Sequence, residues 1–354
     1  MILKKKFYKN LQIGLAMVLY YQDKKLSEQQ FKSEAEFENI IVENSNLFFG
    51  DSSIFIETKK KIDSKFLGGT IPDGFLIDLS DIDNPEFYIV EVELANHDFY
   101  KHIFPQITKF FSFFKNPQSV SELVEKIFNI INKDSSYKKR LKSLIKSQEI
   151  YKFLKDLIES SHNILLIIDG DKDELPEIME TYTDTWGSMV TLMLIKKFKY
   201  KDEIIYSVQP DFNDIQYGDA ESSTLKRSNK VFYLTEEEKL NQTSQEAKEA
   251  YLKIKSELLN ISDEIIFNPQ RYYLSVSFIR NIAFYKFRRK KIRLIIKLPI
   301  EEASKIINNH KIIQLSASVQ KFYNGSSCAI DIHNSDNLEE IIDAFKILIE
   351  KQSS

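Results

Sequence analysis

Short apolar runs in the first two-thirds of the chain have the length and the β-branched content of buried strands. The predicted strands lie at 53–58, 71–78, 87–94, 163–169, 190–200 and 203–209. The runs at 71–78 and 87–94 flank the turn signal Asp-Ile-Asp-Asn-Pro, so we expect them to pair as a hairpin. The last two runs are predicted to form a second hairpin.

Segments between these runs follow the helical period instead. Apolar residues recur at helical spacing after Ser33, and Glu36 completes a capping box that predicts the start of a helix. Another helix is predicted to begin near Pro105, and residues 120–160 read as further helices. Strands that alternate with helices indicate an α/β protein.

The last third of the chain is predicted to be separate. Its composition turns polar from 211 to 244, which indicates a linker with one short strand at 231–233. Residues 245–354 predict a small α+β domain that opens with a helix at 245–260. Its other expected elements are strands at 271–288, 292–298, 311–316 and 327–333, and helices at 301–308 and 337–351. The first domain is expected to span 1–210, with its chemical motifs at 34–110 and a strand–helix–strand extension at 160–210.

The composition is typical of a globular protein in a reducing compartment. Of 354 residues, 43% are hydrophobic and 29% are charged, and Cys328 is the only cysteine. No run reaches the roughly 18–20 apolar residues that cross a bilayer. No small-residue cleavage site follows the apolar stretch at 13–21, so we expect no signal peptide and a cytoplasmic location. With a net charge of -3, any nucleic-acid site must be a local patch.

Three carboxylates are expected to converge at one edge of the predicted sheet. Glu91 and Glu93 lie on the same face of one strand, because side chains alternate between faces. Asp73 comes close to the same edge if the two strands pair. Two buried acids are costly unless a cation holds them, so this arrangement predicts a Mg²⁺ or Mn²⁺ site.

These residues resemble the motifs of the PD-(D/E)xK nuclease superfamily. Pro72-Asp73 is followed by Glu91-x-Glu93 and then by Gln106-x-x-x-Phe110. The resemblance implies a restriction-endonuclease-like mixed sheet flanked by helices, with Asp73 and Glu91 as ligands of a divalent ion. Glu93 stands where the family usually carries Lys, as it does in some restriction enzymes of the superfamily.

The resemblance also implies roles for other residues. A Glu on the first helix completes the metal site, with Glu34 as the first choice and Glu38 as the second. Glu93 is expected to act as general base or to bind a second ion, and Gln106 and Lys101 to position the phosphate. The alternative is that all three acids near the start of this helix, Glu34, Glu36 and Glu38, stabilise it through its dipole.

Several other polar clusters allow two interpretations. His97 and His102 are either solvated histidines or catalytic ones, and the acids at 169–174 are predicted to cap a helix that runs through Trp186. A basic cluster near 290 either grips a phosphate backbone or forms a soluble hairpin tip. Its members are Arg288, Arg289, Lys290, Lys291 and Arg293, interleaved with Tyr285 and Phe287.

The leading hypothesis is a Mg²⁺-dependent endonuclease that acts on DNA, with RNA as an open alternative and with restriction or defence as a context suggested by analogy. The other hypothesis is a nuclease-like module that binds nucleic acid or a partner protein without cutting. The C-terminal domain resembles a small domain of unknown function that is often appended to nucleases, through 235–240, 272–274 and 337–342. It could sense a ligand or a companion subunit, and a homodimer is a further possibility.

Overall fold

The computed structural model describes residues 19–21, 24–58, 71–145, 148–170, 172, 174, 175, 178, 189–217, 235–270 and 273–353. The chain divides into two compact units. The first comprises Met1–Ser80 and Pro85–Asn213, and the second comprises Asp81–Asn84 and Asp214–Ser354. Each unit is described by itself below.

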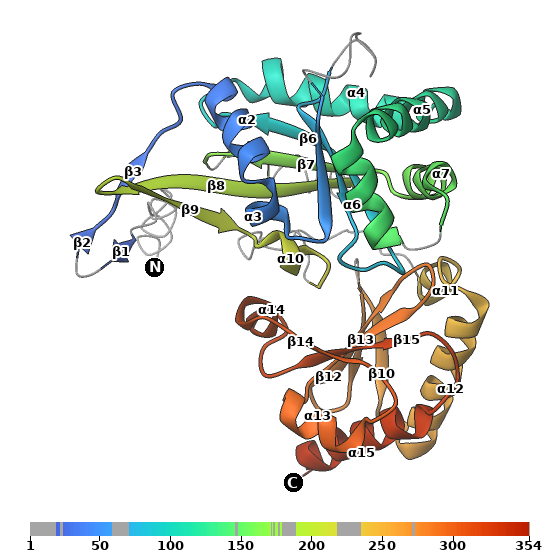
Figure 1. The fold of residues 1–354 in the computed structure, drawn as a ribbon. Coiled ribbons are helices and arrows are strands. Elements are labelled where there is room, and N and C mark those ends of the chain that lie inside the picture. The colour runs from blue at the N-terminus through green and yellow to red at the C-terminus, as the bar shows by residue number, and fades with distance from the viewer. Residues whose placement is uncertain are drawn as a thin grey trace, which may run out of the picture. The chain divides into compact units, whose positions relative to one another are not determined.

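The first unit contains a seven-stranded mixed sheet (Figure 1). Its strands are β3 (Ser27–Gln29), β4 (Ser53–Glu57), β5 (Gly74–Asp78), β6 (Glu86–Glu93), β7 (Asn163–Ile168), β8 (Val190–Tyr200) and β9 (Glu203–Gln209). Strands β4, β5 and β6 are antiparallel neighbours, and β6, β7 and β8 run parallel. Strands β3 and β9 both pair antiparallel with β8. The predicted hairpins and the α/β class are confirmed.

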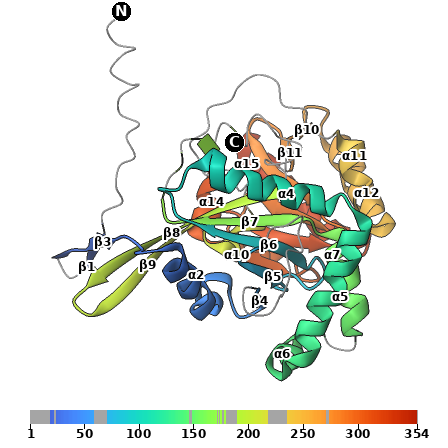
Figure 2. The ribbon, with the colours of Figure 1, turned by 90° about the horizontal axis from the view of Figure 1, so that it is seen from above.

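Helices pack on both faces of this sheet (Figure 2). They are α2 (Glu34–Glu43), α3 (Ser45–Phe49), α4 (Phe104–Phe114), α5 (Pro117–Lys133), α6 (Ser135–Ile145), α7 (Ile150–Ser160) and α10 (Phe212–Ile215), with a π-helical turn, η1 (Phe99–Ile103), before α4. Phe75 and Phe87 face the core formed with α4–α7. On the opposite face, Phe55 stacks on Phe49 of α3 and Tyr88 packs against α10. A two-stranded ribbon, β1 (Tyr20–Tyr21) and β2 (Lys24–Lys25), completes the described elements of the unit.

The second unit is a six-stranded antiparallel sheet with helices. The strands are β10 (Ile266–Pro269), β11 (Leu274–Ser277), β12 (Asn281–Phe287), β13 (Ile292–Ile296), β14 (Ile312–Gln314) and β15 (Cys328–Ile332). The helices are α11 (Glu236–Leu240), α12 (Gln245–Ile261), α13 (Ile300–Ile306), α14 (Ala317–Phe322) and α15 (Leu338–Ser353). Apolar residues of α12 and α15, such as Tyr251 and Phe345, pack against Tyr285 and Leu294 of the sheet.

The structure differs from the sequence-based expectation at four places in this region. The strand expected at 271–288 is two strands, because the chain turns at Phe278, whose N–H donates to Arg280 O at 3.1 Å. The short helices α10 and α11 lie within the expected linker, and neither strand β10 nor helix α14 was predicted. The strand expected at 231–233 and most of the helix expected through Trp186 lie outside the described residues. No helix in the described part of the chain has the length and apolar character to span a bilayer.

Candidate metal centre

The first two turns of α2 bring two carboxylates, Glu34 and Glu38, to Asp73. Ser33 caps the helix as predicted, since its Oγ accepts the N–H of Glu36 at 3.2 Å. Asp73 directly precedes β5, where its N–H donates to Val90 O at 3.1 Å and its Oδ2 accepts the N–H of Val92 at 2.7 Å. One donor oxygen each of Asp73, Glu34 and Glu38 lies within 4.8 Å of the others.

A second group of donors shares Glu34. Nδ1 of His97 lies 2.8 Å from Oε2 of Glu93 and 3.4 Å from Oε2 of Glu34. His97 is held in the turn after β6, where its N–H donates to Leu94 O at 3.0 Å and its carbonyl accepts the ammonium group of Lys172. Because Glu34 belongs to both groups, they form one centre, which we call the acidic centre.

The donor chemistry of the acidic centre fits a divalent metal ion. Four carboxylates and one imidazole gather at the end of the hairpin, and repulsion among several acids is relieved by a cation. An all-oxygen set from Asp73, Glu34 and Glu38 is of the kind that Mg²⁺ or Mn²⁺ binds. The set from Glu34, Glu93 and His97 adds a nitrogen donor, which also suits transition-metal ions.

Glu91 is the other expected partner of Asp73. It is only 2% exposed and lies opposite Leu166 of β7. The antiparallel register that pairs Gly74 with Val90 sets Asp73 beside Glu91 on the neighbouring strand. The ligand pair of Asp73 and Glu91 stays a prediction, and the structure adds Glu34 and Glu38 next to Asp73.

Lys101 and Gln106 do not meet the acidic centre through any contact found in the described residues. The Lys101 side chain is 79% exposed, and its Nζ lies 3.5 Å from Asp98 Oδ2 within the same turn. Gln106 is half-buried at the start of α4, and its Oε1 has no hydrogen-bond partner in the described part of the molecule. The ring of His102 lies near that of His97, tilted by 39° with centroids 5.4 Å apart. The basic side chain beside Glu93 is therefore His97, which was left between two interpretations. Its position four residues after Glu93 is the signal that the sequence offered.

The first-turn acids of α2 have different partners. Glu34 and Glu38 belong to the acidic centre, whereas Oε1 of Glu36 accepts the ammonium group of Lys197 at 2.7 Å and its Oε2 accepts the N–H of Lys32 at 2.6 Å. The hydrogen bond from Lys197, followed by that from Lys32, lowers the pKa of Glu36. The helix-dipole interpretation stays open, because an acid near the helix start can have another partner as well.

Asp169 holds the ends of two parallel strands together instead of joining the donor groups. Its Oδ1 accepts the N–H of Ala95 at 2.6 Å, which links the residue after β7 to the turn after β6. The prediction that residues 169–174 cap a helix cannot be followed further, because residues 171 and 173 lie outside the described residues.

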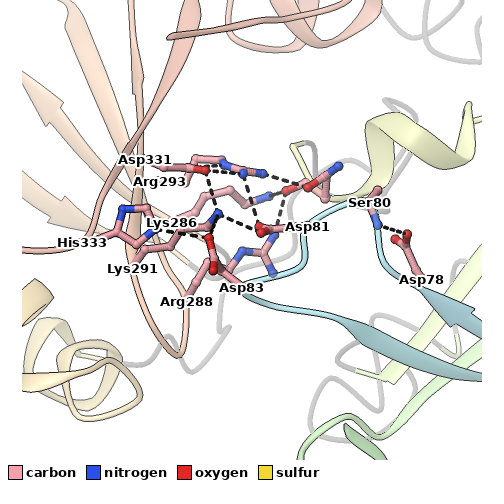
Figure 3. A network of polar contacts seen from close by, with 11 residues as sticks. Asp78, Ser80, Asp81, Asp83, Lys286, Arg288, Lys291, Arg293, Asp331 and His333 are labelled. Atoms are coloured by element: carbon pink, nitrogen blue, oxygen red, sulfur yellow. Dashed lines mark hydrogen bonds and ion pairs between the residues drawn. The ribbon is translucent and has the colours of Figure 1, made fainter. Parts of the chain in front are cut away.

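The basic cluster of the second unit is not one exposed patch, and that interpretation is wrong for two members. Figure 3 shows Lys291 and Arg293 surrounded by carboxylates. Both side chains are 3% exposed; Lys291 Nζ lies 2.8 Å from Asp81 and 2.7 Å from Asp331, and Arg293 Nε lies 2.7 Å from Asp331. Buried cations require such partners, and Asp331 is provided by β15, directly opposite Arg293 in the antiparallel register.

The remaining members of the basic cluster differ in their exposure to solvent and in their contacts. Arg288 donates to Gln216 O at 2.8 Å, while Arg289 and Lys290 are exposed at the β12–β13 turn. Tyr285 is buried against Tyr251, so it offers no surface for base stacking. The hairpin-tip interpretation fits these positions better than a phosphate-gripping patch.

Comparison of the chain with protein-family models, curated proteins and solved structures found no match. The acidic centre is therefore interpreted from its own geometry.

Proposed function

We propose that the first unit is a metal-dependent nuclease that hydrolyses phosphodiester bonds, with DNA as its first expected substrate. The observation that carries the proposal is the acidic centre, where acids from α2, from the start of β5 and from the end of β6 gather with His97. The resemblance to the PD-(D/E)xK superfamily supports it, since a mixed sheet flanked by helices with acids at strand ends is what that resemblance implies.

Asp73, Glu34 and Glu38 would hold the ion, because they supply the oxygen donors that Mg²⁺ prefers. When bound, such an ion supplies positive charge against the phosphate oxygens and makes a water molecule more acidic. The backbone N–H of Val92 fixes the Asp73 carboxylate, and the Ser33 cap fixes the helix that carries the other two acids. The ligands are thus held in place by the fold before the ion arrives.

Glu93 and His97 would handle the proton of the attacking water. Nδ1 of His97 lies 2.8 Å from Oε2 of Glu93, and because an ionised carboxylate only accepts hydrogen bonds, Nδ1 would carry the hydrogen. That tautomer makes Nε2 the acceptor nitrogen, in the arrangement of an imidazole base oriented by a carboxylate. His97 then performs the task that the usual motif Lys would have, and Glu93 positions it.

The test is Mg²⁺- or Mn²⁺-dependent cleavage of plasmid, linear and single-stranded DNA and of RNA, with metal binding measured separately by calorimetry. Asp73→Asn and Glu34→Gln are expected to abolish both metal binding and cleavage while the far-ultraviolet circular dichroism stays unchanged. Glu43→Gln, at the exposed end of the same helix, is the matched control and should behave as wild type. Cleavage at the wild-type rate by Asp73→Asn would refute the proposal.

The alternative function, a nuclease-like module that binds without cutting, is favoured by two features. Glu93 occupies the position that usually carries Lys, and the net charge of -3 leaves no global attraction for phosphate. Mobility shifts of nucleic acid without nicking, under every metal tested, would select this function over the nuclease.

A further inference from the structure

A polar pocket of about 340 Å³ lies at the edge of the first unit's sheet where β6 and β7 end. Its wall is formed by Leu94–Asn96, Asp169 and Gly170 at the ends of these strands, by Lys196 and Lys197 of β8, and by residues 28–31, which include the carboxylate of Glu28. In sheets with parallel strands, ligands bind beyond the carboxyl ends of the strands. The pocket therefore lies where such a fold presents a binding site.

The pocket is continuous in sequence with the acidic centre. Leu94–Asn96 is the segment that connects Glu93 to His97, and the turn is closed by the hydrogen bond from His97 N–H to Leu94 O. A ligand seated against this turn would lie beside the carboxylate–imidazole pair. Oδ1 of Asp169, on the pocket wall, already accepts a hydrogen bond from the N–H of Ala95.

The two lysines of the pocket differ in what they contact. Lys197 is buried, with its Nζ 2.7 Å from Glu36 and 4.6 Å from the ring centroid of Phe31. Lys196 points to the other face of β8 and is half-buried; in the described part of the chain no ion pair involves it. Lys197 is thus paired with Glu36 of α2. Lys196 is the lysine of the pocket that can bind an anion.

We propose that this pocket binds one phosphate-bearing nucleotide unit of the substrate chain, with Lys196 contacting the phosphate. The proposal rests on the proposed function, because it places the nucleotide next to Glu93 and His97. The volume suits a small ligand and excludes a double helix. The substrate class is therefore nucleic acid that is single-stranded at the bound position.

The experiment measures the affinity of the full chain for a short fluorescein-labelled single-stranded DNA by anisotropy across a series of salt concentrations, with Ca²⁺ in place of Mg²⁺. Lys196→Gln should weaken binding about tenfold, as loss of a charged hydrogen bond does. It should also reduce the slope of log affinity against log salt by about 0.7, the value for one phosphate contact on a single strand. Lys199→Gln, an exposed lysine of the same strand outside the pocket, is the matched control.

Wild-type affinity and salt slope in Lys196→Gln would refute the proposed phosphate contact. Equal losses of affinity in Lys196→Gln and Lys199→Gln would also refute it, because they would indicate a non-specific attraction to the lysines of β8. Thymidine 5′-monophosphate should compete with the labelled strand in the wild type, and thymidine should not. If the wild type cleaves with Mg²⁺ but Lys196→Gln binds normally, the pocket fails and the nuclease stands. If binding depends on Lys196 and no metal supports cleavage, the nuclease fails and the pocket stands.

Discussion

At the scale of the residue, His97 is the group that most changes how the acidic centre can act. Its Nδ1 lies within hydrogen-bond distance of Glu93 and close to Glu34, so two carboxylates orient one imidazole. An imidazole takes up and releases protons near neutral pH more readily than any other ordinary side chain. His97 is thus the side chain that would accept the proton in the proposed reaction.

His97→Gln is expected to lower the cleavage rate about 10²–10⁴-fold, the usual contribution of a general base. Metal affinity should stay close to that of the wild type, because the oxygen donors of Asp73, Glu34 and Glu38 remain. The measurement is single-turnover cleavage across pH, together with a metal titration. Loss of metal binding in this variant would instead assign His97 to the ligand set with Glu34 and Glu93.

Glu340 shows how one carboxylate fixes a loop. It accepts the backbone N–H groups of Asn308 at 3.0 Å and of His310 at 3.1 Å, and also the His310 ring nitrogen at 2.5 Å. Partial burial would raise the pKa of Glu340, but the hydrogen bonds from His310 and from the backbone of Asn308 and Asn309 lower it from 4.5 to about 2. The carboxylate form is therefore strongly preferred in the folded state.

A lowered pKa means that the stabilisation by Glu340 is present above pH 4.5 and is lost as the pH falls towards about 2. Glu340→Gln should reduce the free energy of unfolding by about 1–3 kcal/mol at pH 7, because backbone donors lose a charged acceptor. At pH 2 the variant and the wild type should differ much less. Urea denaturation at both pH values measures this, and an equal difference at both would contradict the assignment.

At the scale of the element, α2 is the helix whose start determines the acidic centre. Its cap, the hydrogen bond from Glu36 N–H to Ser33 Oγ, sets where the first turn begins, and that turn carries Glu34. Lys197 of β8 fixes the same turn through Glu36, at 2.7 Å. A helix cap and a buried ion pair therefore determine the position of a ligand that neither of them contacts.

Ser33→Ala is expected to cost about 1 kcal/mol of stability, the usual value for a lost cap, and to weaken metal binding as the first turn frays. Ser244→Ala is the matched control, since Ser244 caps α12 in the second unit by accepting the N–H of Ala247. It should cost a similar free energy of unfolding and leave metal affinity unchanged. Thermal unfolding and calorimetric metal titration of both variants test this. Equal metal affinities in the two variants would show that the Ser33 cap does not position the metal ligands.

At the scale of the whole molecule, the densest basic segment of the described residues is largely paired with acids. The net charge of -3 already argues against a global field, and the densest basic segment of the second unit is partly buried among acids. Burial has the largest single influence on the pKa of Lys291 and lowers it. Together, the hydrogen bonds and charges of Asp331 and Asp81 outweigh burial, so the pKa of Lys291 is raised. These cations stabilise a fold and do not attract a ligand.

Asp331→Ala should destabilise the second unit by about 3–5 kcal/mol, because it leaves two cations buried without their main partner. Arg289→Ala, at the exposed tip of the same hairpin, should change stability by less than about 0.5 kcal/mol. Chemical denaturation of the two variants provides the comparison. A small effect of Asp331→Ala would mean that water reaches the cluster.

The sequence by itself determined most of the local structure. The period of apolar residues located the strands from β4 to β9, the Ser33 cap located α2, and paired acids on β6 marked where chemistry was expected. The family resemblance pointed to Glu34 and Glu38 as the helix acids of the predicted site, and both lie on one face of the helix. These features depend on neighbours within a few residues, which a single sequence displays directly.

Only the tertiary structure decided which polar groups meet. It places Asp73 next to the acids of α2 and His97 next to Glu93. It also buries Lys291 and Arg293 among acids that lie far away in the chain. It also split one expected strand at Phe278 and left Lys101 beside Asp98. Contacts of this kind depend on strand order and on register between distant segments, and hydrophobic period carries no record of either.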